Sequence, residues 1–223
     1  MARKLGRQVR SSEAKMTGSN QLISLVLSAC LIAGCAVSPP SRQENICAVF
    51  DQFPDWYDYA KASEAKWGTP THILMAFIKR ESSYQHDAKP PYEWFLFIPL
   101  GRKSSAKGYA QVQDPAWEDY TDETGGLFKS RSDINDALDF IGWYNNKSNQ
   151  RLGISKWNPK RLYLAYHEGH GGYQRKSYEK KPKVLRTANE VNRLAREYGK
   201  QLRRCEHRFK CRKWYQFWPL CRK

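Results

Sequence analysis

The sequence predicts a mainly α-helical fold with about six helices and one long loop or hairpin. In several segments, apolar residues recur every three or four positions, which is the spacing of a helix with one buried face. Three times a residue of a helix-capping type stands directly before a proline, as expected at a helix start: the pairs are Thr69-Pro70, Asp114-Pro115 and Asn158-Pro159. No alternating pattern is long enough to indicate an extensive sheet.

The N-terminal segment is typical of an export signal. Residues 1–20 are basic, and residues 22–33 form a short apolar run. Such a run is too short for a stable membrane span and fits a secretory signal peptide. Leu31-Ile32-Ala33-Gly34-Cys35 resembles the lipobox of bacterial lipoproteins, in which the cysteine is acylated and becomes the mature N-terminus. We therefore expect a lipoprotein signal peptide over 1–34; an ordinary signal peptide is the alternative.

Residues 35–45 would then be the lipidated Cys35 followed by a tether. The segment 36–45 is polar and contains prolines, so it is expected to hold the domain off the membrane. Ala36 follows the cysteine, and the lipoprotein resemblance implies that a residue other than Asp there favours the outer membrane. The expected location is the outer membrane, facing the periplasm.

The chain is strongly basic, which favours an anionic partner. It has 38 Lys and Arg against 22 Asp and Glu, a net charge of +16. Removal of residues 1–34, with five basic residues and one acidic residue, lowers this to +12. For an exported protein, lipid headgroups and the cell wall are better candidates than nucleic acid.

Four cysteines remain beyond Cys35. In an oxidising compartment they favour two disulfides, with three possible pairings; the candidates are Cys47, Cys205, Cys211 and Cys221. The alternative is a zinc site made by the last three of these with His207, although their spacing lacks the close Cys-x-x-Cys pair of structural zinc sites. We expect disulfides, no metal and no cofactor.

Further helices are expected on either side of the capped ones. Residues 56–67 keep a three-to-four spacing, and Gly68 ends that segment. Ser132 is expected to cap another helix. A long final helix is expected from about Lys183 to Cys205, with its apolar residues on one side.

Residues 89–108 form the one long loop of the predicted fold. Its middle, residues 92–100, reads YEWFLFIPL and is too apolar for a simple linker. Long structured loops in compact domains are often functional. We expect a hairpin or a flap over a groove.

Glu81 occupies an unusual position for a carboxylate. On a helix over 69–84, Leu74, Phe77, Ile78 and Glu81 share one face. A carboxylate at the end of an apolar stripe is costly unless it is neutral, paired or at a cleft. Burial and the negative C-terminal end of a helix both raise its pKa. A carboxyl that stays protonated near neutral pH can serve as the general acid of glycosidic bond cleavage; a surface glutamate paired with Lys or Arg is the alternative.

Three sequence motifs follow one another along the chain, and the first of them contains Glu81. They are Glu81-Ser82-Ser83-Tyr84, then SSAKGYAQV at 104–112, then AYHEGHGGY at 165–173. Together they resemble the soluble lytic transglycosylase family, over roughly residues 55–200. The resemblance implies a mainly helical, lysozyme-like α+β domain with a glycan-binding groove. It also implies cleavage between N-acetylmuramic acid and N-acetylglucosamine, with a 1,6-anhydro end formed instead of the addition of water.

The same resemblance implies roles for single residues. Glu81 matches the catalytic acid/base, and Ser82 matches the serine that follows it. Gln111 matches the family's glutamine, and we expect Ser82 and Gln111 to hold the N-acetyl group or the sugar hydroxyls. Tyr166 matches the tyrosine near the acid and is expected to donate a hydrogen bond to Glu81.

Departures from the family pattern add further candidates for substrate binding. Tyr109-Ala110 replaces the usual Leu-Met pair, His167 stands where Asn is usual, and Glu168 stands where a small residue is usual. His170 is also expected near the groove. The glycines at 169, 171 and 172 are expected to end a helix and let the backbone turn sharply.

A second acid would change the chemistry. If another carboxylate faced Glu81 with space for a water, an inverting hydrolase would become possible. The candidates are Glu93, Asp114, Glu118, Asp119 and Glu168. Asp114 is better explained as a helix cap.

These patterns divide the chain after the tether into two parts. We expect a lysozyme-like transglycosylase domain at 46–198 and a basic tail, rich in cysteines and aromatics, at 199–223. The tail either packs on the domain or attaches to wall or membrane, with nucleic acid the least expected contact. The expected partners are peptidoglycan strands, the membrane through the lipid, and an envelope assembly or transfer apparatus. A non-catalytic wall-binding lipoprotein is the alternative from another class.

Overall fold

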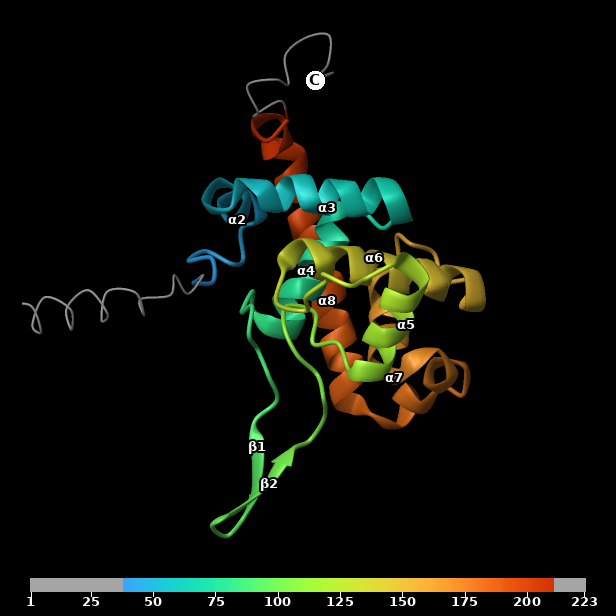
Figure 1. Ribbon diagram of the computed structural model, residues 1–223. Coiled ribbons are helices and arrows are strands. Elements are labelled where there is room, and N and C mark those ends of the chain that lie inside the picture. The colour runs from blue at the N-terminus through green and yellow to red at the C-terminus, as the bar shows by residue number, and fades with distance from the viewer. Residues whose placement is uncertain (1–37, 211–223) are drawn as a thin grey trace, which may run out of the picture. The chain divides into compact units, whose positions relative to one another are not determined.

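Seven α-helices make up most of residues 38–210, the part of the chain that this computed structural model describes (Figure 1). They are α2 (Ile46–Gln52), α3 (Pro54–Trp67), α4 (Thr71–Ser82), α5 (Asp114–Thr124), α6 (Ile134–Leu152), α7 (Pro159–Gln174) and α8 (Pro182–Cys205). Two 3-10 turns, η1 (Ser177–Lys180) and η2 (Glu206–Arg208), lie before and after α8. The prediction of a mainly α fold is confirmed, and α2 is an element that the sequence analysis missed. Within the same residues, no helix combines the length and apolarity needed to cross a membrane.

Helix α4 lies at the centre of the helical body. It packs against α3, α6 and α8, and every side chain from Ile73 to Ile78 is buried. The predicted single apolar stripe is therefore too narrow, because neighbouring helices cover α4 on all sides. Glu81 and Ser82 are the last two residues of α4, and the helix ends at Ser83 with a left-handed φ of 51°.

Tyr84 fixes the chain reversal that follows α4. Its φ of 62° is also left-handed, which is uncommon for a residue other than glycine. The ring is fully buried, and its hydroxyl donates to the Met75 carbonyl at 3.3 Å and lies 3.1 Å from the Tyr198 hydroxyl. These contacts hold the end of α4 against α8.

Two predicted helix ends are confirmed. Gly68 ends α3 with a φ of 81°, and the Asn158 side chain accepts a hydrogen bond from the Arg161 backbone N–H at 3.1 Å at the start of α7. The final helix, expected from about Lys183 to Cys205, is α8.

Three predicted caps are wrong. Pro70, and not Thr69, precedes the first turn of α4. Asp133, one residue after Ser132, accepts hydrogen bonds from the Asn135 and Asp136 backbone N–H groups in the first turn of α6. Asp114 makes no cap bond; it is the first residue of α5 and forms an ion pair with Arg131 instead. Neither Pro70 nor Gln113, the residues directly before α4 and α5, makes a side-chain cap bond, which residue spacing alone does not reveal.

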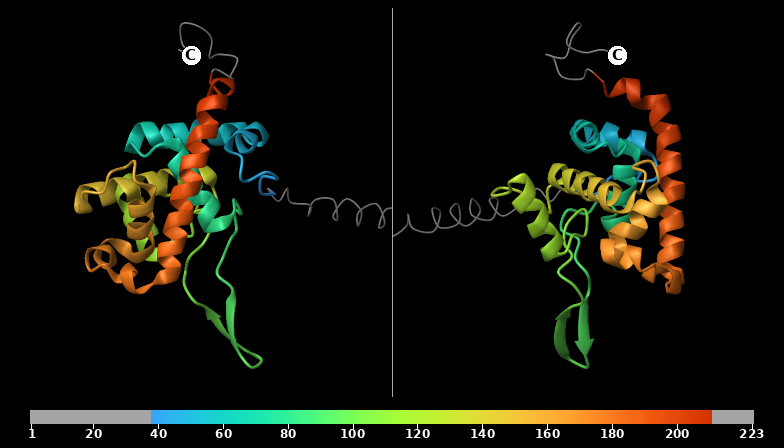
Figure 2. Two further views of the ribbon diagram at one scale, coloured as in Figure 1. Left: turned by 180° about the vertical axis from the view of Figure 1, so that it is seen from behind. Right: turned by 90° about the vertical axis from the view of Figure 1, so that its right-hand side faces the viewer.

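The apolar loop at 89–108 forms a β-hairpin, which is one of the two structures expected from the sequence. Strands β1 (Tyr92–Phe95) and β2 (Ile98–Arg102) are antiparallel, and Phe95 pairs with Ile98. The hairpin extends away from the helices in Figure 1 and in both views of Figure 2. It does not fold over them as a flap.

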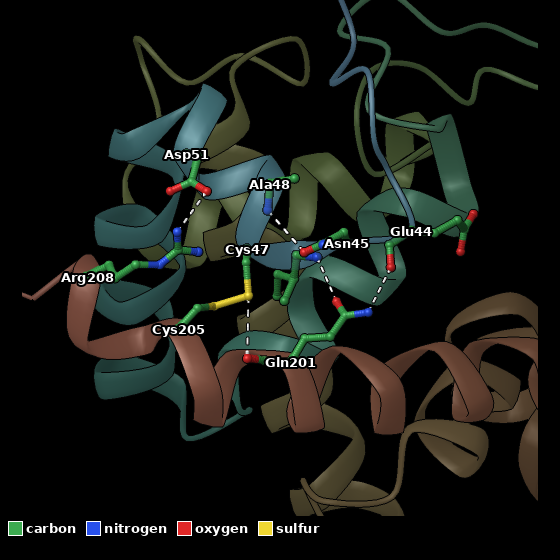
Figure 3. The surroundings of a disulfide bond; sticks show 9 residues. Glu44, Asn45, Cys47, Ala48, Asp51, Gln201, Cys205 and Arg208 are labelled. Carbon is green, nitrogen blue, oxygen red and sulfur yellow. Dashed lines mark hydrogen bonds and ion pairs between the residues drawn. A yellow bond between two sulfur atoms is a disulfide. The ribbon is translucent and has the colours of Figure 1, made fainter.

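A disulfide joins the two ends of the described chain. Cys47 in α2 is bonded to Cys205 at the end of α8, with Cα atoms 6.1 Å apart (Figure 3). The sequence left this pairing open among three. A zinc site would need Cys205 as a free thiolate, and in the structure Cys205 is bound in the disulfide. Cys211 and Cys221 lie outside the described residues.

The segment before α2 packs on the domain where a spacer was expected. Pro40 is buried, and the Gln43 side-chain amide donates to the Ser83 carbonyl at 3.1 Å. Gln201 on α8 accepts from the Ile46 N–H and donates to the Glu44 carbonyl (Figure 3). The described part of the tether therefore contacts α4 and α8. Likewise, the expected tail begins within α8, where Gly199 and Leu202 are buried.

Candidate active site

The carboxyl of Glu81 lies at the C-terminal end of α4, against α7. Burial raises its pKa to about 7, although a hydrogen bond from the Tyr163 hydroxyl and the charge of Arg80 act in the opposite direction. Near neutral pH the group is therefore present both as acid and as base. This agrees with the expectation that a carboxyl at the end of the apolar stripe resists ionisation.

Tyr163, and not Tyr166, supplies the hydrogen bond to Glu81. The Tyr166 hydroxyl instead donates to the Ala110 carbonyl at 2.6 Å, so the predicted bond from Tyr166 is wrong. The two tyrosines are three residues apart on α7 and share a face. The spacing of residues in the sequence does not show which of the two hydroxyls bonds to Glu81. In the structure the Tyr166 hydroxyl donates to the Ala110 carbonyl, and the Tyr163 hydroxyl donates to Glu81.

Arg80 is a neighbour of the site that the sequence analysis missed. Its guanidinium donates to the Thr187 hydroxyl at 3.1 Å and lies 3.3 Å from the Glu190 carboxylate, both on α8. It also hydrogen-bonds to the Tyr163 hydroxyl. Arg80 thus fixes the end of α4 to α7 and α8 and orients the group that bonds Glu81.

A groove of about 300 Å³ lies between the segment after Gly108 and the α6–α7 pair. Four predicted residues line it together with aromatic side chains of α6; they are Gln111, Tyr166, His167 and Glu168. Tyr166 connects the groove to the acid, since burial and then the nearby Glu81 carboxylate raise its pKa well above the usual value. A second hollow of about 420 Å³ shares Pro115, Ala116 and Tyr144 with this groove and extends it along α5 and α6.

Gln111 joins the groove to the base of the hairpin. Its side-chain Nε2 donates to the Ala88 carbonyl at 2.8 Å and to the Gly108 carbonyl at 2.9 Å. The Gly108 N–H also donates to Ala88, at 2.9 Å. Both side-chain bonds use Nε2, so within residues 38–210 the Oε1 atom of Gln111 is left as an acceptor for a ligand.

A known protein family matches most of the chain. The sequence model of the family described as the transglycosylase SLT domain matches residues 23–205. The chain belongs to this family. No curated protein matches the chain. The match includes Glu81, the groove and the helices that carry them. It supports peptidoglycan as the substrate and peptidoglycan cleavage of the transglycosylase type as the activity.

Two predicted substrate contacts of the SLT domain are not in the groove. The Ser82 hydroxyl donates to the Ile78 carbonyl at 3.2 Å within α4, and its side chain is buried. Tyr109 is buried with its ring 5.9 Å from that of Trp56. A residue next to Glu81 is rotated by about 100° round the helix, which turns Ser82 into the core. Tyr109 stands where the family pattern has an apolar residue, and it packs as one.

Glu168 is held by its own neighbours. Only 2% of its side chain is exposed, and its carboxylate accepts from the Ser177 hydroxyl and from Lys181 at 2.9 and 3.0 Å. Burial disfavours the charged form, but the hydrogen bonds from Ser177, Lys181 and His167 outweigh it and lower the pKa of Glu168. Glu168 therefore ties α7 to η1 and α8. His167 is 45% exposed and is the more available of the two for a ligand.

The glycine-rich part of α7 interrupts the helix at Gly169. Gly169 has a φ of 72° and a ψ of 161°, and helical geometry resumes after it up to Gln174. The predicted helix end and sharp turn are both confirmed at Gly169, after which a second, short helical segment follows. His170, just past the kink, stacks on Tyr144 with ring centroids 4.6 Å apart and so belongs to the wall of the second hollow.

None of the candidate second acids acts on Glu81 in the described part of the SLT domain, where Arg80 is the charged group that shifts its pKa. Asp114 pairs with Arg131, and Glu168 is held as described above. Glu93 is on the hairpin, 3.7 Å from Lys103. Glu118 and Asp119 are exposed on α5.

Proposed function

We propose that this SLT-domain protein is a lytic transglycosylase in which Glu81 is the single acid/base. It would cleave the β-1,4 bond between N-acetylmuramic acid and N-acetylglucosamine and leave a 1,6-anhydro end. The observation that carries the proposal is the half-buried Glu81 side chain, whose carboxyl has a pKa raised to about 7 by desolvation, without a second carboxylate among residues 38–210 contributing to the shift.

The chemistry follows from one group that changes protonation state. Protonated Glu81 gives its proton to the glycosidic oxygen as the bond from that oxygen to C1 breaks. The carbonyl oxygen of the substrate's own N-acetyl group stabilises the cationic C1. The Glu81 carboxylate then removes the proton of the muramoyl 6-hydroxyl as that oxygen bonds to C1. This closes the anhydro ring and restores the acid.

The groove suits a glycan strand. Sugar rings stack on aromatic faces, and the partly exposed Tyr144 and Tyr166 line the groove. Gln111 Oε1 and the exposed His167 offer polar contacts beside them. The continuation into the second hollow gives room for more than one sugar unit.

The product distinguishes this proposal from hydrolysis on the same fold. Purified sacculi are digested with the protein, and the released muropeptides are analysed by mass spectrometry. We expect ends in 1,6-anhydro-muramate, lighter by one water than hydrolytic ends. Reducing ends would show that water, and not the 6-hydroxyl, attacks C1.

We also propose that Cys35 carries the lipid that anchors the protein to the outer membrane, facing the periplasm. The lipobox-like residues 31–35 support this, and so does the Cys47–Cys205 disulfide, which fits an oxidising compartment. From that position the enzyme could open the wall for an envelope assembly or transfer apparatus. Cys35→Ala should abolish both incorporation of labelled palmitate and retention in the membrane fraction.

A further inference from the structure

The hairpin exposes large apolar side chains that the fold does not bury. The exposed fractions are 51% for Tyr92, 77% for Leu96, 93% for Phe97, 62% for Ile98 and 65% for Leu100. Contiguous exposed apolar surface of this kind marks an interaction site. A two-stranded hairpin gains little stability by itself in water, so its function lies in what covers the tip.

The turn at the tip supports the same conclusion independently. Phe95 pairs with Ile98, so Leu96 and Phe97 form a two-residue turn, and Leu96 has a φ of 55°. Turns of this length favour Asn and Gly, which tolerate a positive φ. Leucine there is conformationally costly, and folding gives no reason to place two large apolar residues at the apex.

The stem of the hairpin identifies the chemistry of the partner. Between Ala88 and Lys107 the basic residues are Lys89, Arg102, Lys103 and Lys107, all exposed, and the acid is Glu93, which is paired with Lys103. An apolar tip with a basic stem fits an anionic lipid surface, where apolar groups enter the interface and cations meet phosphates. A second copy of this basic chain would be repelled.

The position of the hairpin also suits a membrane contact. It projects from the helices in every view (Figures 1 and 2), and its two stem ends are joined by the bonds of Gln111 and Gly108 to Ala88. A strand advances roughly 3.3 Å per residue, so the tip reaches roughly 25 Å from Ala88. An interfacial segment is buried by only about 5–10 Å, which leaves the groove in water.

We propose that the tip of the β1–β2 hairpin inserts into the surface of an anionic lipid bilayer, with the basic stem on the lipid phosphates. This contact is additional to the lipid proposed at Cys35 and does not depend on it.

Vesicle binding tests this directly. Residues 38–223 are used, because they lack Cys35 and include the whole described part, 38–210, which has its own core. Binding is measured by co-sedimentation with vesicles of phosphatidylcholine alone and of phosphatidylcholine mixed with phosphatidylglycerol. The test variant is Leu96→Ser/Phe97→Ser. The chain offers a matched control in Leu127→Ser/Phe128→Ser, the same dipeptide, 97% and 98% exposed on another loop.

We expect the wild-type protein to prefer the anionic vesicles. The hairpin variant should bind them roughly tenfold or more weakly, because two apolar side chains no longer enter the interface, whereas the control variant should bind as wild type. Lys103→Gln, which removes an exposed cation nearer the tip, should weaken binding to anionic vesicles roughly fivefold and leave binding to neutral vesicles unchanged. Unchanged digestion of sacculi by the hairpin variant would show that it is folded.

Equal binding of the hairpin variant and wild type would overturn the proposal. So would equal binding of wild type to neutral and anionic vesicles. Sedimentation in the ultracentrifuge gives a third arm: if wild type self-associates and the hairpin variant does not, the tip is a contact between copies of this chain.

Discussion

The reactive properties of Glu81 come from the residues immediately around it. Burial alone would hold the carboxyl protonated, whereas the hydroxyl of Tyr163 and the charge of Arg80 favour the anion. The balance leaves the pKa at about 7, where one group can serve both as acid and as base. Arg80 holds this arrangement in place through its bonds to Thr187 and Glu190.

Removal of the Tyr163 hydroxyl should raise the pKa of Glu81 further. Its hydrogen bond stabilises the anion, so Tyr163→Phe should move the alkaline limb of the kcat/KM profile to higher pH. Tyr166→Phe is the control, because that hydroxyl bonds to Ala110. If the alkaline limb moved in Tyr166→Phe and not in Tyr163→Phe, the hydrogen bond to Glu81 would come from Tyr166 and not from Tyr163.

The raised pKa of Glu81 also makes the stability of the fold depend on pH. The folded-state pKa of about 7 is above the ordinary value of 4.5, so the native state binds the proton more tightly than the unfolded chain. The resulting stability is complete below pH 4.5 and is lost as pH rises towards 7. Glu81→Gln should therefore stabilise the protein at pH 8 relative to wild type, by up to about 3 kcal/mol. Denaturant unfolding at pH 8 and at pH 4.5 measures this, and an equal effect at both would mean that the pKa is not raised.

At the residue scale, the sequence predicted the acid but not its contacts. An apolar stripe ending in a carboxylate is visible in any helical projection, so Glu81 was identifiable. The choice between Tyr163 and Tyr166, and the inward rotation of Ser82, depend on which backbone carbonyls lie within reach. That information is tertiary and is absent from residue spacing.

At the scale of elements, the hairpin stem and the loop before α6 are fixed to each other at Gly108. This residue has a φ of +77°, and a Cβ there would lie 1.9 Å from the Arg131 carbonyl oxygen. The Tyr109 N–H donates to the same carbonyl at 3.1 Å. The close approach of the two segments therefore requires glycine.

Gly108→Ala should destabilise the protein by roughly 2–4 kcal/mol, from backbone strain and the clash with Arg131. Thermal unfolding measures the effect. Gly171→Ala is the control, because its added Cβ would meet only the flexible end of Arg175, at 3.2 Å. If the two variants lost comparable unfolding free energy, the added Cβ at position 108 would not clash with the Arg131 carbonyl.

Most helices were predictable as elements, and their exact ends were not. Gly68 and Asn158 carry strong local signals, and both are helix ends in the structure. At the start of α6 two adjacent residues could cap, and Asp133 does. At Gly169 the first helical segment of α7 ends, as the glycines predict, but a second segment follows directly up to Gln174, which the glycines alone do not indicate.

At the scale of the whole molecule, the two ends of the described chain close on each other. The Cys47–Cys205 disulfide joins residues 158 positions apart. Beside it, Gln201 bonds the segment before α2, and Asp51 pairs with Arg208 at 3.3 Å (Figure 3). The sequence predicted disulfides from the export signal, but the pairing required the packing of α2 on α8.

Loss of this disulfide should be costly, because it closes a very long loop in the unfolded chain. The chain-entropy estimate is about 5 kcal/mol. Cys47→Ser/Cys205→Ser should lower the unfolding free energy by an amount of this order in denaturant titrations under oxidising conditions. A variant as stable as the oxidised wild type would show that the bond does not form or does not constrain the chain.

The most direct measurement compares two glutamate variants on the same substrate. Glu81→Gln and Glu168→Gln each remove one carboxyl group, the first at the end of α4 and the second on α7, and sacculi digested with each protein are analysed for soluble anhydro-muropeptides. With Glu81 as the single acid/base, Glu81→Gln should release none above background, whereas Glu168→Gln should retain activity because that carboxylate is bound to Ser177 and Lys181. Release by Glu81→Gln at the wild-type rate would contradict the assignment of the acid.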